Sequence, residues 1–251
     1  MSKLTNPRVC MSKEEILECI SKKQPFTIHP RLTSLNLGYN NIGDEGAKSL
    51  GNALKLNSAL TELDLRDNHI GPGGAKTFAE VLKDNNTLSS LDLRLNKIRK
   101  DGAESLGDAL KDNNTLTTLN LTHTEIGDYG AKSLADALKD NKALTSLDLD
   151  SNKIGVEGAK ALGDALKDNI TVAFLDLGYN QIGTEGKDIL LKVKEYRLFV
   201  RRKTQNNILM ILCQFCLREE KDDCLLYQLP LEIIHMIIRF VGIVPQLQIE
   251  L

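Results

Sequence analysis

Residues 32–59 read LTSLNLGYNNIGDEGAKSLGNALKLNSA, and residues 144–171 read LTSLDLDSNKIGVEGAKALGDALKDNIT. The same phrase occurs six times between residues 32 and 182, always with a step of 28 residues. A period of this length is typical of a stacked solenoid, because a single unit cannot bury its own apolar face. The repeat therefore predicts the fold before any single residue is considered.

Two periodicities within the repeat indicate its secondary structure. Leu63 and Leu65 alternate with polar neighbours, which favours a short strand. In the preceding repeat, Ala47, Leu50 and Leu54 lie at helical spacing and would form one apolar stripe. One strand and one helix per repeat predict an α/β solenoid, or horseshoe, with helical caps. The parallel sheet should lie on the concave side, because the wider helices must line the convex side.

The motif L-x-x-L-x-L-x-x-N-x-I, repeated over about 60% of the chain, resembles the leucine-rich repeat family. Val172 opens the last copy in place of Leu, and Thr124 takes the Asn position of the fourth. The 28-residue step is similar to that of the ribonuclease-inhibitor class, and the phrase GA-x-x-L-x-x-AL resembles the bacterial GALA proteins. The resemblance implies a protein-binding horseshoe without catalytic chemistry, and it names no partner.

The composition of the chain sets limits on its partners and compartment. Lys and Arg number 32 against 34 Asp and Glu, so no overall field favours nucleic acid or a membrane. The five cysteines lie outside the repeats, and their odd number disfavours a disulfide framework. The start MSKLTNPRVC has no apolar run typical of a signal peptide, and the apolar stretch 208–213 is too short to span a bilayer. We expect a cytoplasmic protein that is monomeric when free.

Three regions are predicted along the chain. Residues 1–31 should hold a capping helix, opened by the capping-box pattern that begins at Ser12, and a lead-in to the first repeat. Residues 32–186 should form the six repeats. Residues 187–251 should form a helical cap, because terminal units of a solenoid shield its apolar end. That cap is expected to begin with a basic helix reaching Arg202, followed by helices over 206–217 and 231–241.

Strand geometry indicates which side chains could bind a partner. If the leucines three and five residues after the opening residue point inward, the second, fourth and sixth residues point out of the concave sheet. The seventh and ninth residues lie on the adjacent rim. Interface anchors are enriched in Tyr, Trp and Arg within a polar ring, so positions that break the repeat are the most informative. The predicted partner-binding residues are Tyr39, Glu62, Asp64, Arg66, Asp92, Arg94, Leu95, Lys97, His123, Asp148, Asp150, Phe174, Asp176 and Tyr179.

Some of these residues have two interpretations. The aspartates in the fourth position could attract a basic partner. Alternatively, L-D-L is simply the default phrase, with each Asp next to Arg66 or Arg94 of a neighbouring repeat, and we favour this alternative. Tyr39 and Tyr179 could anchor a partner or pack against the caps. The basic run around Lys97 could contact a carboxylate-rich loop or be a solvated edge.

Catalytic and metal chemistry have little support in the sequence. Cys213 and Cys216 have the spacing of zinc ligands, and Cys224 and His235 could complete a set of four. The two closer cysteines would lie on one face of an apolar helix, so we favour buried thiols over a metal site. The histidines are scattered, without a nucleophile at a motif spacing. We therefore expect no enzyme activity, cofactor or metal.

The predicted function is a non-catalytic scaffold that binds one protein on its concave face and rim, to inhibit, occlude or recruit it. Family likeness extends this to a bacterial effector delivered into the host cytosol. Residues 229–241 resemble the opening helix of an F-box, which suggests a substrate adaptor that docks on a ubiquitin-ligase subunit as the alternative. A cap helix with Pro at its first position explains the same residues. Assembly through the exposed helices is a third, purely structural possibility.

Overall fold

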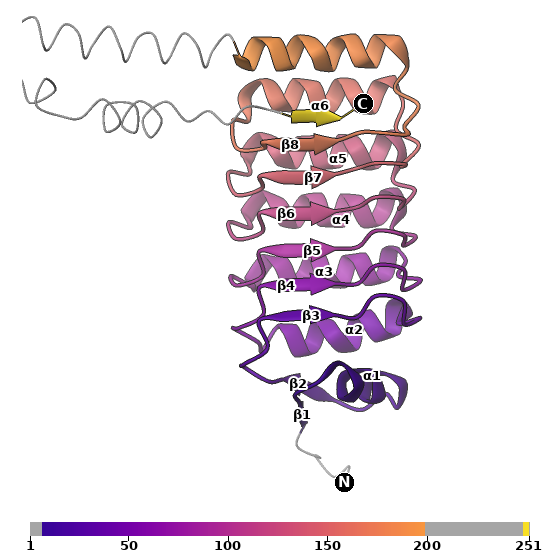
Figure 1. Cartoon of the computed structure of the whole chain (residues 1–251), viewed down its shortest axis with the longest axis vertical. Helices are drawn as coiled ribbons and strands as arrows, with labels where there is room; N and C mark the ends of the chain where they lie inside the picture. The colour runs from indigo at the N-terminus through magenta and orange to yellow at the C-terminus, as the bar shows by residue number, and fades with distance from the viewer. Residues whose placement is uncertain (1–6, 199–247, 251) are drawn as a thin grey trace, which may run out of the picture.

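The computed structural model describes residues 7–198 and 248–250 of the chain, and within them each repeat contributes one strand and one helix (Figure 1). The strands of the repeats are β3 (Ser34–Asn36), β4 (Glu62–Asp64), β5 (Ser90–Asp92), β6 (Thr118–Asn120), β7 (Ser146–Asp148) and β8 (Phe174–Asp176). The helices are α2 (Gly43–Leu54), α3 (Pro72–Asp84), α4 (Arg99–Asp112), α5 (Gly127–Asp140), α6 (Val156–Asp168) and an unlabelled helix over residues 183–198. The predicted alternation of strand and helix is confirmed.

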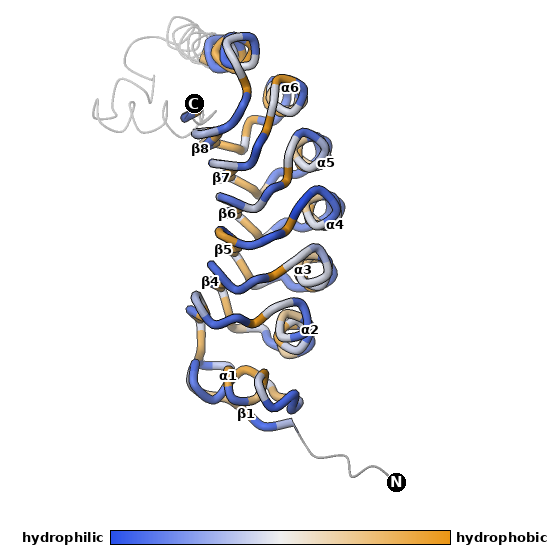
Figure 2. The backbone as a smooth tube through the Cα atoms, turned by 90° about the vertical axis from the view of Figure 1, so that its right-hand side faces the viewer, coloured by the Kyte–Doolittle hydropathy of each residue, from blue (hydrophilic) through white to orange (hydrophobic). Residues whose placement is uncertain are grey.

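The strands form one parallel sheet in the order β3-β4-β5-β6-β7-β8-β9, where β9 is Gln248–Glu250. Neighbouring repeats pair in register, so that Leu35 lies opposite Leu63 and Leu63 opposite Leu91. The sheet lies on the concave side of the stack and the helices on the convex side (Figure 2). The strand leucines and the Ala and Leu residues of the helices share a single buried core between the two layers. The predicted α/β solenoid is therefore confirmed, with its sheet on the inner side.

An asparagine ladder joins the repeats just after the strands. Asn96 Oδ1 accepts the backbone N–H groups of Asn68 at 3.0 Å and Ile70 at 2.9 Å, both in the preceding repeat. Its Nδ2 donates to Leu65 O at 2.9 Å. Buried peptide groups are thus paired without a continuous strand. In the fourth repeat, Thr124 Oγ1 donates to Leu121 O at 2.6 Å. Among the described contacts, no hydrogen bond joins Thr124 to Asn96 or Ile98, so the ladder is interrupted there.

A second ladder, which the sequence did not reveal, joins the ends of the helices. The KDN endings suggest only a polar helix terminus, but three of their asparagines, Asn113, Asn141 and Asn169, are buried. Asn141 Nδ2 donates to Leu110 O at 2.6 Å in the preceding repeat, and its Oδ1 accepts the N–H of Leu144 at 2.7 Å. The same position one repeat beyond Asn169 is taken by Arg197, whose guanidinium donates to Val172 O at 3.0 Å and Ile170 O at 3.2 Å. Burial lowers the pKa of Arg197, which is 3% exposed.

The segment before the first repeat combines a helix with a small sheet. Helix α1 (Lys13–Ser21) has Ser12 as its N-cap, and Ser12 Oγ accepts the N–H of Glu15 at 3.3 Å as the capping-box pattern predicts. Two strands that were not predicted, β1 (Arg8–Cys10) and β2 (Phe26–Ile28), pair in parallel. The side chains of Cys10, Phe26 and Ile28 join the core of the repeats. The free thiols of Cys10 and Cys19 lie 3.6 Å apart, and burial raises the pKa of Cys10 to about 12.

At the other end of the stack, the described residues of the predicted cap form the end of one helix and one strand. The helix over 183–198 agrees with the start of the predicted basic helix, whose remainder lies outside the described residues. Strand β9 pairs with β8 and extends the sheet, and no feature of the sequence had predicted a strand there. The zinc candidates Cys213, Cys216, Cys224 and His235, the predicted helix over 206–217 and the F-box-like segment 229–241 also lie outside the described residues. Within the described ranges, every helix is too short or too polar to cross a membrane.

Candidate protein-binding surface

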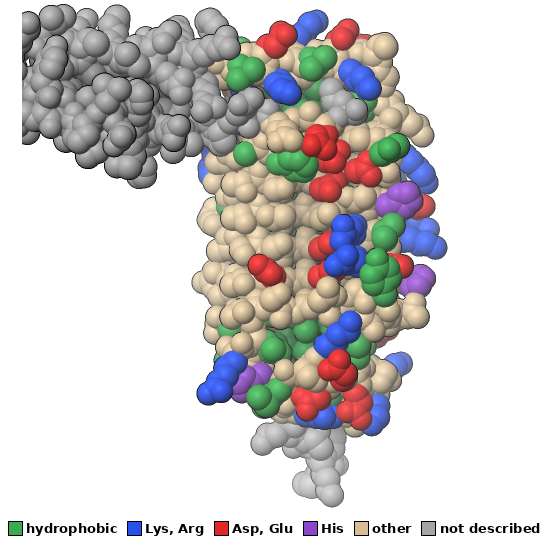
Figure 3. Space-filling view, in the orientation of Figure 1, with side chains coloured by type: hydrophobic (Ala, Val, Ile, Leu, Met, Phe, Trp, Pro, Cys, Tyr) green, Lys and Arg blue, Asp and Glu red, His purple; other side chains and the backbone are tan. Residues whose placement is uncertain are grey.

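The predicted partner-binding residues all lie on the concave sheet or on the rim formed by the loops after the strands. Glu62, Asp64, Asp92, Asp148, Phe174 and Asp176 point out of the strands, Arg66, Arg94 and Asp150 follow them, and Tyr39, Leu95, Lys97, His123 and Tyr179 lie on the rim. Charged side chains gather over the carboxyl ends of the strands (Figure 3). The exposed face of the sheet therefore has two parts. A charged strip near the carboxyl ends of the strands contains Asp64, Arg66, Asp92, Arg94, Asp148, Asp150 and Asp176, and a mainly uncharged strip lies beside it.

The uncharged strip lies where the strands begin, and much of its hydrogen bonding is internal. Thr61 Oγ1 donates to Thr33 O at 2.9 Å, and Thr117 Oγ1 donates to Ser89 O at 3.0 Å. Each hydroxyl thus binds the carbonyl of the preceding repeat. The sequence did not predict this third ladder. Its hydroxyl donors are already hydrogen-bonded within the stack, so they are not free to bind a partner. The charged strip and the rim are the better candidates for recognition.

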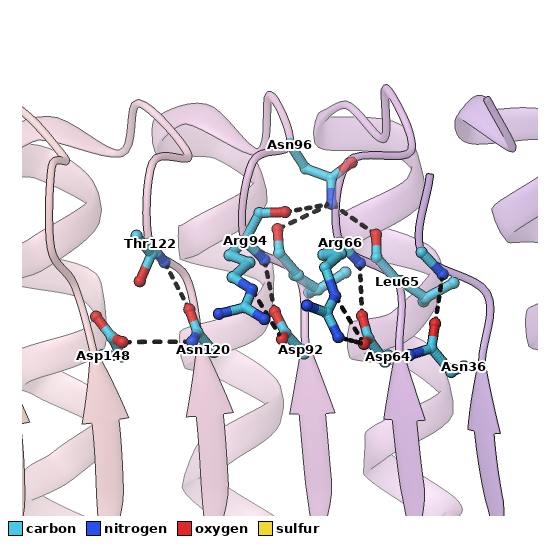
Figure 4. A network of polar contacts seen from close by, with 12 residues as sticks. Asn36, Asp64, Leu65, Arg66, Asp92, Arg94, Asn96, Asn120, Thr122 and Asp148 are labelled. Atoms are coloured by element: carbon cyan, nitrogen blue, oxygen red, sulfur yellow. Dashed lines mark hydrogen bonds and ion pairs between the residues drawn. The ribbon is translucent and has the colours of Figure 1, made fainter. Parts of the chain in front are cut away.

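The acidic fourth position of the repeat has a structural role (Figure 4). Asp64 Oδ1 accepts the N–H of Arg66 at 3.0 Å, and Asp92 Oδ1 accepts that of Arg94 at 3.0 Å. Asn120 makes the same contact with the N–H of Thr122 at 2.9 Å. Asp and Asn serve equally, because the turn requires only a side-chain oxygen acceptor. This contact favours the second interpretation of the acidic column, in which L-D-L belongs to the repeat itself.

The two arginines of the charged strip pair differently from the prediction. Arg66 Nε donates to Asp64 at 2.8 Å, and Arg94 Nε lies 3.2 Å from Asp92, so each cation pairs within its own repeat. The predicted pairing with a neighbouring repeat is wrong, because the side chain of the sixth position turns back over its own strand. Burial raises the pKa of Asp92 despite this ion pair. Both arginines keep exposed edges that a partner could contact.

The rim residues are held in an unusual backbone conformation. Tyr39, Leu95 and Tyr179 have φ angles of 64°, 58° and 50°. This left-handed conformation turns the chain sharply and leaves the three side chains 64%, 43% and 93% exposed. Arg66 lies over the Tyr39 ring, 5.9 Å from its centroid. Neither tyrosine is buried against a described part of the caps, so both are accessible to a partner.

The third repeat contributes a basic stretch to the rim. Arg99 occupies a position where other repeats have Gly, and its φ is 57°. Its guanidinium lies 3.6 Å from Glu125, which also lies 3.5 Å from Lys153. Lys100 lies over the ring of Tyr129, 5.8 Å from the centroid. The basic stretch is therefore partly neutralised, and Tyr129, at 76% exposed, is an aromatic side chain that the sequence analysis overlooked.

A cavity of about 650 Å³ opens at the far end of the charged strip. Asp150, Asp176, Tyr179, Lys187 and Glu250 contribute to its lining. Sequence reasoning missed Glu250, because this residue reaches the site only through the pairing of β9 with β8. Among the described residues, no group of His, Cys, Asp or Glu is arranged to hold a metal ion.

The geometry defines a class of protein: a repeat solenoid with an open concave sheet and an exposed rim. Six segments of the chain match the family model "Leucine Rich repeat", at residues 30–51, 56–79, 84–107, 112–135, 140–163 and 168–186. These segments cover more than half of the sequence, and the chain belongs to the leucine-rich repeat family.

Two solved structures are similar to this chain at low sequence identity. One is leiomodin-1 actin-binding site 2, with 20% identity and a TM-score of 0.45, where the match covers 78% of this chain and 96% of that one. The other is the tropomodulin C-terminal domain of Caenorhabditis elegans, with 12% identity and a TM-score of 0.46, covering 76% and 98%. A search of curated proteins found no match.

Proposed function

We propose that this chain is a non-catalytic scaffold that binds one protein partner on its concave face and rim. Membership of the leucine-rich repeat family supports the general role of protein binding. The observation that carries the more specific proposal is the group formed by Tyr39, Arg66, Arg94 and Leu95. These residues belong to three consecutive repeats and combine exposed aromatic, apolar and guanidinium groups. Such combinations, ringed by polar residues, are typical of interface anchors.

Binding by this group explains why the repeat is broken there. The ladders and turns need Asn, Asp, Thr or Leu at defined positions, and those positions recur in nearly every repeat. An exposed rim position has no such requirement, because its side chain adds nothing to the core or to the ladders, and the contact of Tyr39 with Arg66 lies at the surface. Tyr39 and Leu95 expose apolar surface in water, which lowers solubility without adding to the core. A partner that covers Tyr39 and Leu95 would remove this apolar surface from water.

The test is a pull-down from the native cell, followed by binding measurements with purified partner. The double variant Arg94→Glu, Leu95→Glu should lower affinity at least about tenfold, because each anchor contributes more than 1 kcal/mol in a typical interface. A matched control on the convex side is Lys132→Glu, Lys160→Glu, which reverses one exposed cation on α5 and one on α6. Unchanged binding by the concave-face variant, with an unchanged circular dichroism spectrum, would refute the proposed surface.

The consequence of binding is to inhibit, occlude or recruit the partner, in the cytoplasm. The likeness of the repeat to the 28-residue ribonuclease-inhibitor class and to the GALA proteins favours an effector delivered into a host cell. An adaptor for a ubiquitin ligase, acting through residues 229–241, is the alternative. Its test is co-purification with the ligase docking subunit, lost in an Ile233→Asp variant. A point variant is preferable to truncation, because removing residues 225–251 would also remove β9.

A further inference from the structure

The outer edge of β8 receives a strand that does not belong to any repeat. In the paired register, Phe174 lies opposite Gln248, Leu175 opposite Ile249 and Asp176 opposite Glu250. These are the places that the strand of a seventh repeat would take. The N–H of Gln248 donates to Ala173 O at 2.7 Å, and the N–H of Leu177 donates to Glu250 O at 2.8 Å. The side chain of Ile249 is 9% exposed and joins the apolar core.

The charges at this edge disfavour the binding of β9, the strand that occupies it. Glu250 lies opposite Asp176, and like charges directly opposite each other destabilise a sheet. Asp148 and Asp150 lie close enough to add to the repulsion: after burial, these two carboxylates and Glu250 contribute to the raised pKa of Asp176. Lys187 lines the same cavity without forming an ion pair with Glu250 or Asp176 among the described contacts. Asp64 and Asp92, by contrast, each have an arginine.

We propose that the outer edge of β8 is a strand-binding site, that β9 is its displaceable occupant, and that the preferred ligand is an extended segment of a partner protein. The segment would carry a branched apolar residue at the place of Ile249 and a Lys or Arg at the place of Glu250. Backbone pairing along the sheet edge supplies affinity, as in other cases of strand addition. The apolar side chain would fill the space beside Leu175, and the cation would meet Asp176 and Asp150. This site is separate from the proposed concave-face group and does not depend on it.

The direct test uses the full chain and three labelled heptapeptides. The first has the sequence of residues 245–251, PQLQIEL, the second is its Glu250→Lys version, and the third adds Ile249→Asp. In a full-length Ile249→Asp variant, the resident strand loses its apolar contact and should vacate the edge. The Lys peptide should bind this variant several-fold more tightly than it binds the unmodified chain. It should also bind roughly threefold to thirtyfold more tightly than the Glu peptide, while the Asp-containing peptide should not bind.

Two results would overturn the proposal. One is equal affinity of the Lys peptide for the unmodified chain and the Ile249→Asp variant. The other is equal affinity of the Lys and Glu peptides for that variant. Adding Arg94→Glu, Leu95→Glu to the Ile249→Asp chain should leave peptide binding unchanged, so a failure here is distinguishable from a failure of the concave-face proposal. Circular dichroism of each variant confirms that the repeats remain folded.

A second measurement needs no added ligand. Hydrogen exchange of the Leu177 amide reports on β9, because this N–H donates to Glu250 O. In a full-length Glu250→Lys variant, the repulsion becomes attraction, and this amide should exchange roughly twofold to tenfold more slowly. The amide of Leu149, which donates to Asp176 O one repeat earlier, is the internal control and should be unaffected. Equal exchange of Leu177 in both chains would contradict the charge preference.

Discussion

The carboxylate of Asp44 caps the helix of the next repeat: its Oδ1 accepts the N–H of Gly71 at 2.6 Å. The same oxygen accepts the N–H of Gly74 at 2.9 Å, in the first turn of α3. Asp128 makes the same contacts at the start of α6: its Oδ1 accepts the N–H of Gly155 at 2.7 Å and that of Gly158 at 2.9 Å. Neither helix has a side-chain cap of its own, so the preceding repeat supplies one.

This capping predicts a stability effect that crosses repeats. Asp44→Ala and Asp128→Ala should each lower the free energy of unfolding by about 1 kcal/mol, the usual cost of losing an N-cap side chain. Glu45→Ala is the control, because Glu45 is an exposed acid in the same turn without a contact to the next repeat among those described. Denaturant unfolding of the three variants measures the difference. An equal loss for Glu45→Ala would mean that only the helix dipole is involved.

The interrupted ladder at Thr124 predicts a stabilising substitution. In Thr124→Asn, Oδ1 can accept the N–H groups of Asn96 and Ile98, and Nδ2 can donate to Leu93 O, as Asn96 does one repeat earlier. Restoring these bonds should raise the free energy of unfolding by about 1–2 kcal/mol. Thr122→Asn, outside the ladder, should leave it unchanged. A Thr124→Asn variant that unfolds at the same denaturant concentration as the unmodified chain would show that Thr already satisfies the junction.

The left-handed backbone of Arg99 predicts a second stabilising substitution. Three of the five glycines at the corresponding position, Gly43, Gly127 and Gly183, have φ angles of 60°, 61° and 60°, which Gly adopts without strain. Arg99→Gly should raise the free energy of unfolding by about 1 kcal/mol, less any loss from the exposed contact with Glu125. Arg99→Ala keeps the strain and loses the contact, so thermal unfolding of this variant should occur at or below the original temperature. Equal gains in both variants would contradict the backbone explanation.

The raised pKa of Asp176 predicts a pH-dependent effect. A carboxyl whose pKa is higher in the folded state destabilises that state above the unfolded pKa, and the penalty disappears as pH falls below that value. Asp176→Asn keeps the acceptor for the N–H of Gly178 and removes the charge. It should raise the free energy of unfolding at pH 7 by about 0.2–1 kcal/mol, the range for a like-charge pair across strands. The gain should vanish near pH 3, and a gain that persists there would exclude the electrostatic cause.

Sequence determined the fold of this protein to an unusual extent. Leu63, Leu65 and their equivalents predict strand and helix because apolar spacing reports directly on periodic burial. Repetition then settles the topology, since identical units in tandem can bury their faces only by stacking. The exposed rim residues could be located for the same reason: Tyr39 and Leu95 break a pattern whose other positions are fixed.

Only the tertiary structure decided which polar groups meet. The cap from Asp44 to Gly71, the buried KDN asparagines and the pairing of Arg66 with its own Asp64 all depend on where a side chain lies across repeats or turns. Strand β9 is the extreme case, because its partner β8 lies more than 70 residues earlier in the sequence. Apolar residues that are buried recur in the sequence with the period of the strand or helix, so their burial can be predicted. A hydrogen bond or an ion pair needs a single short distance between two atoms, and that distance is set only when the chain is folded.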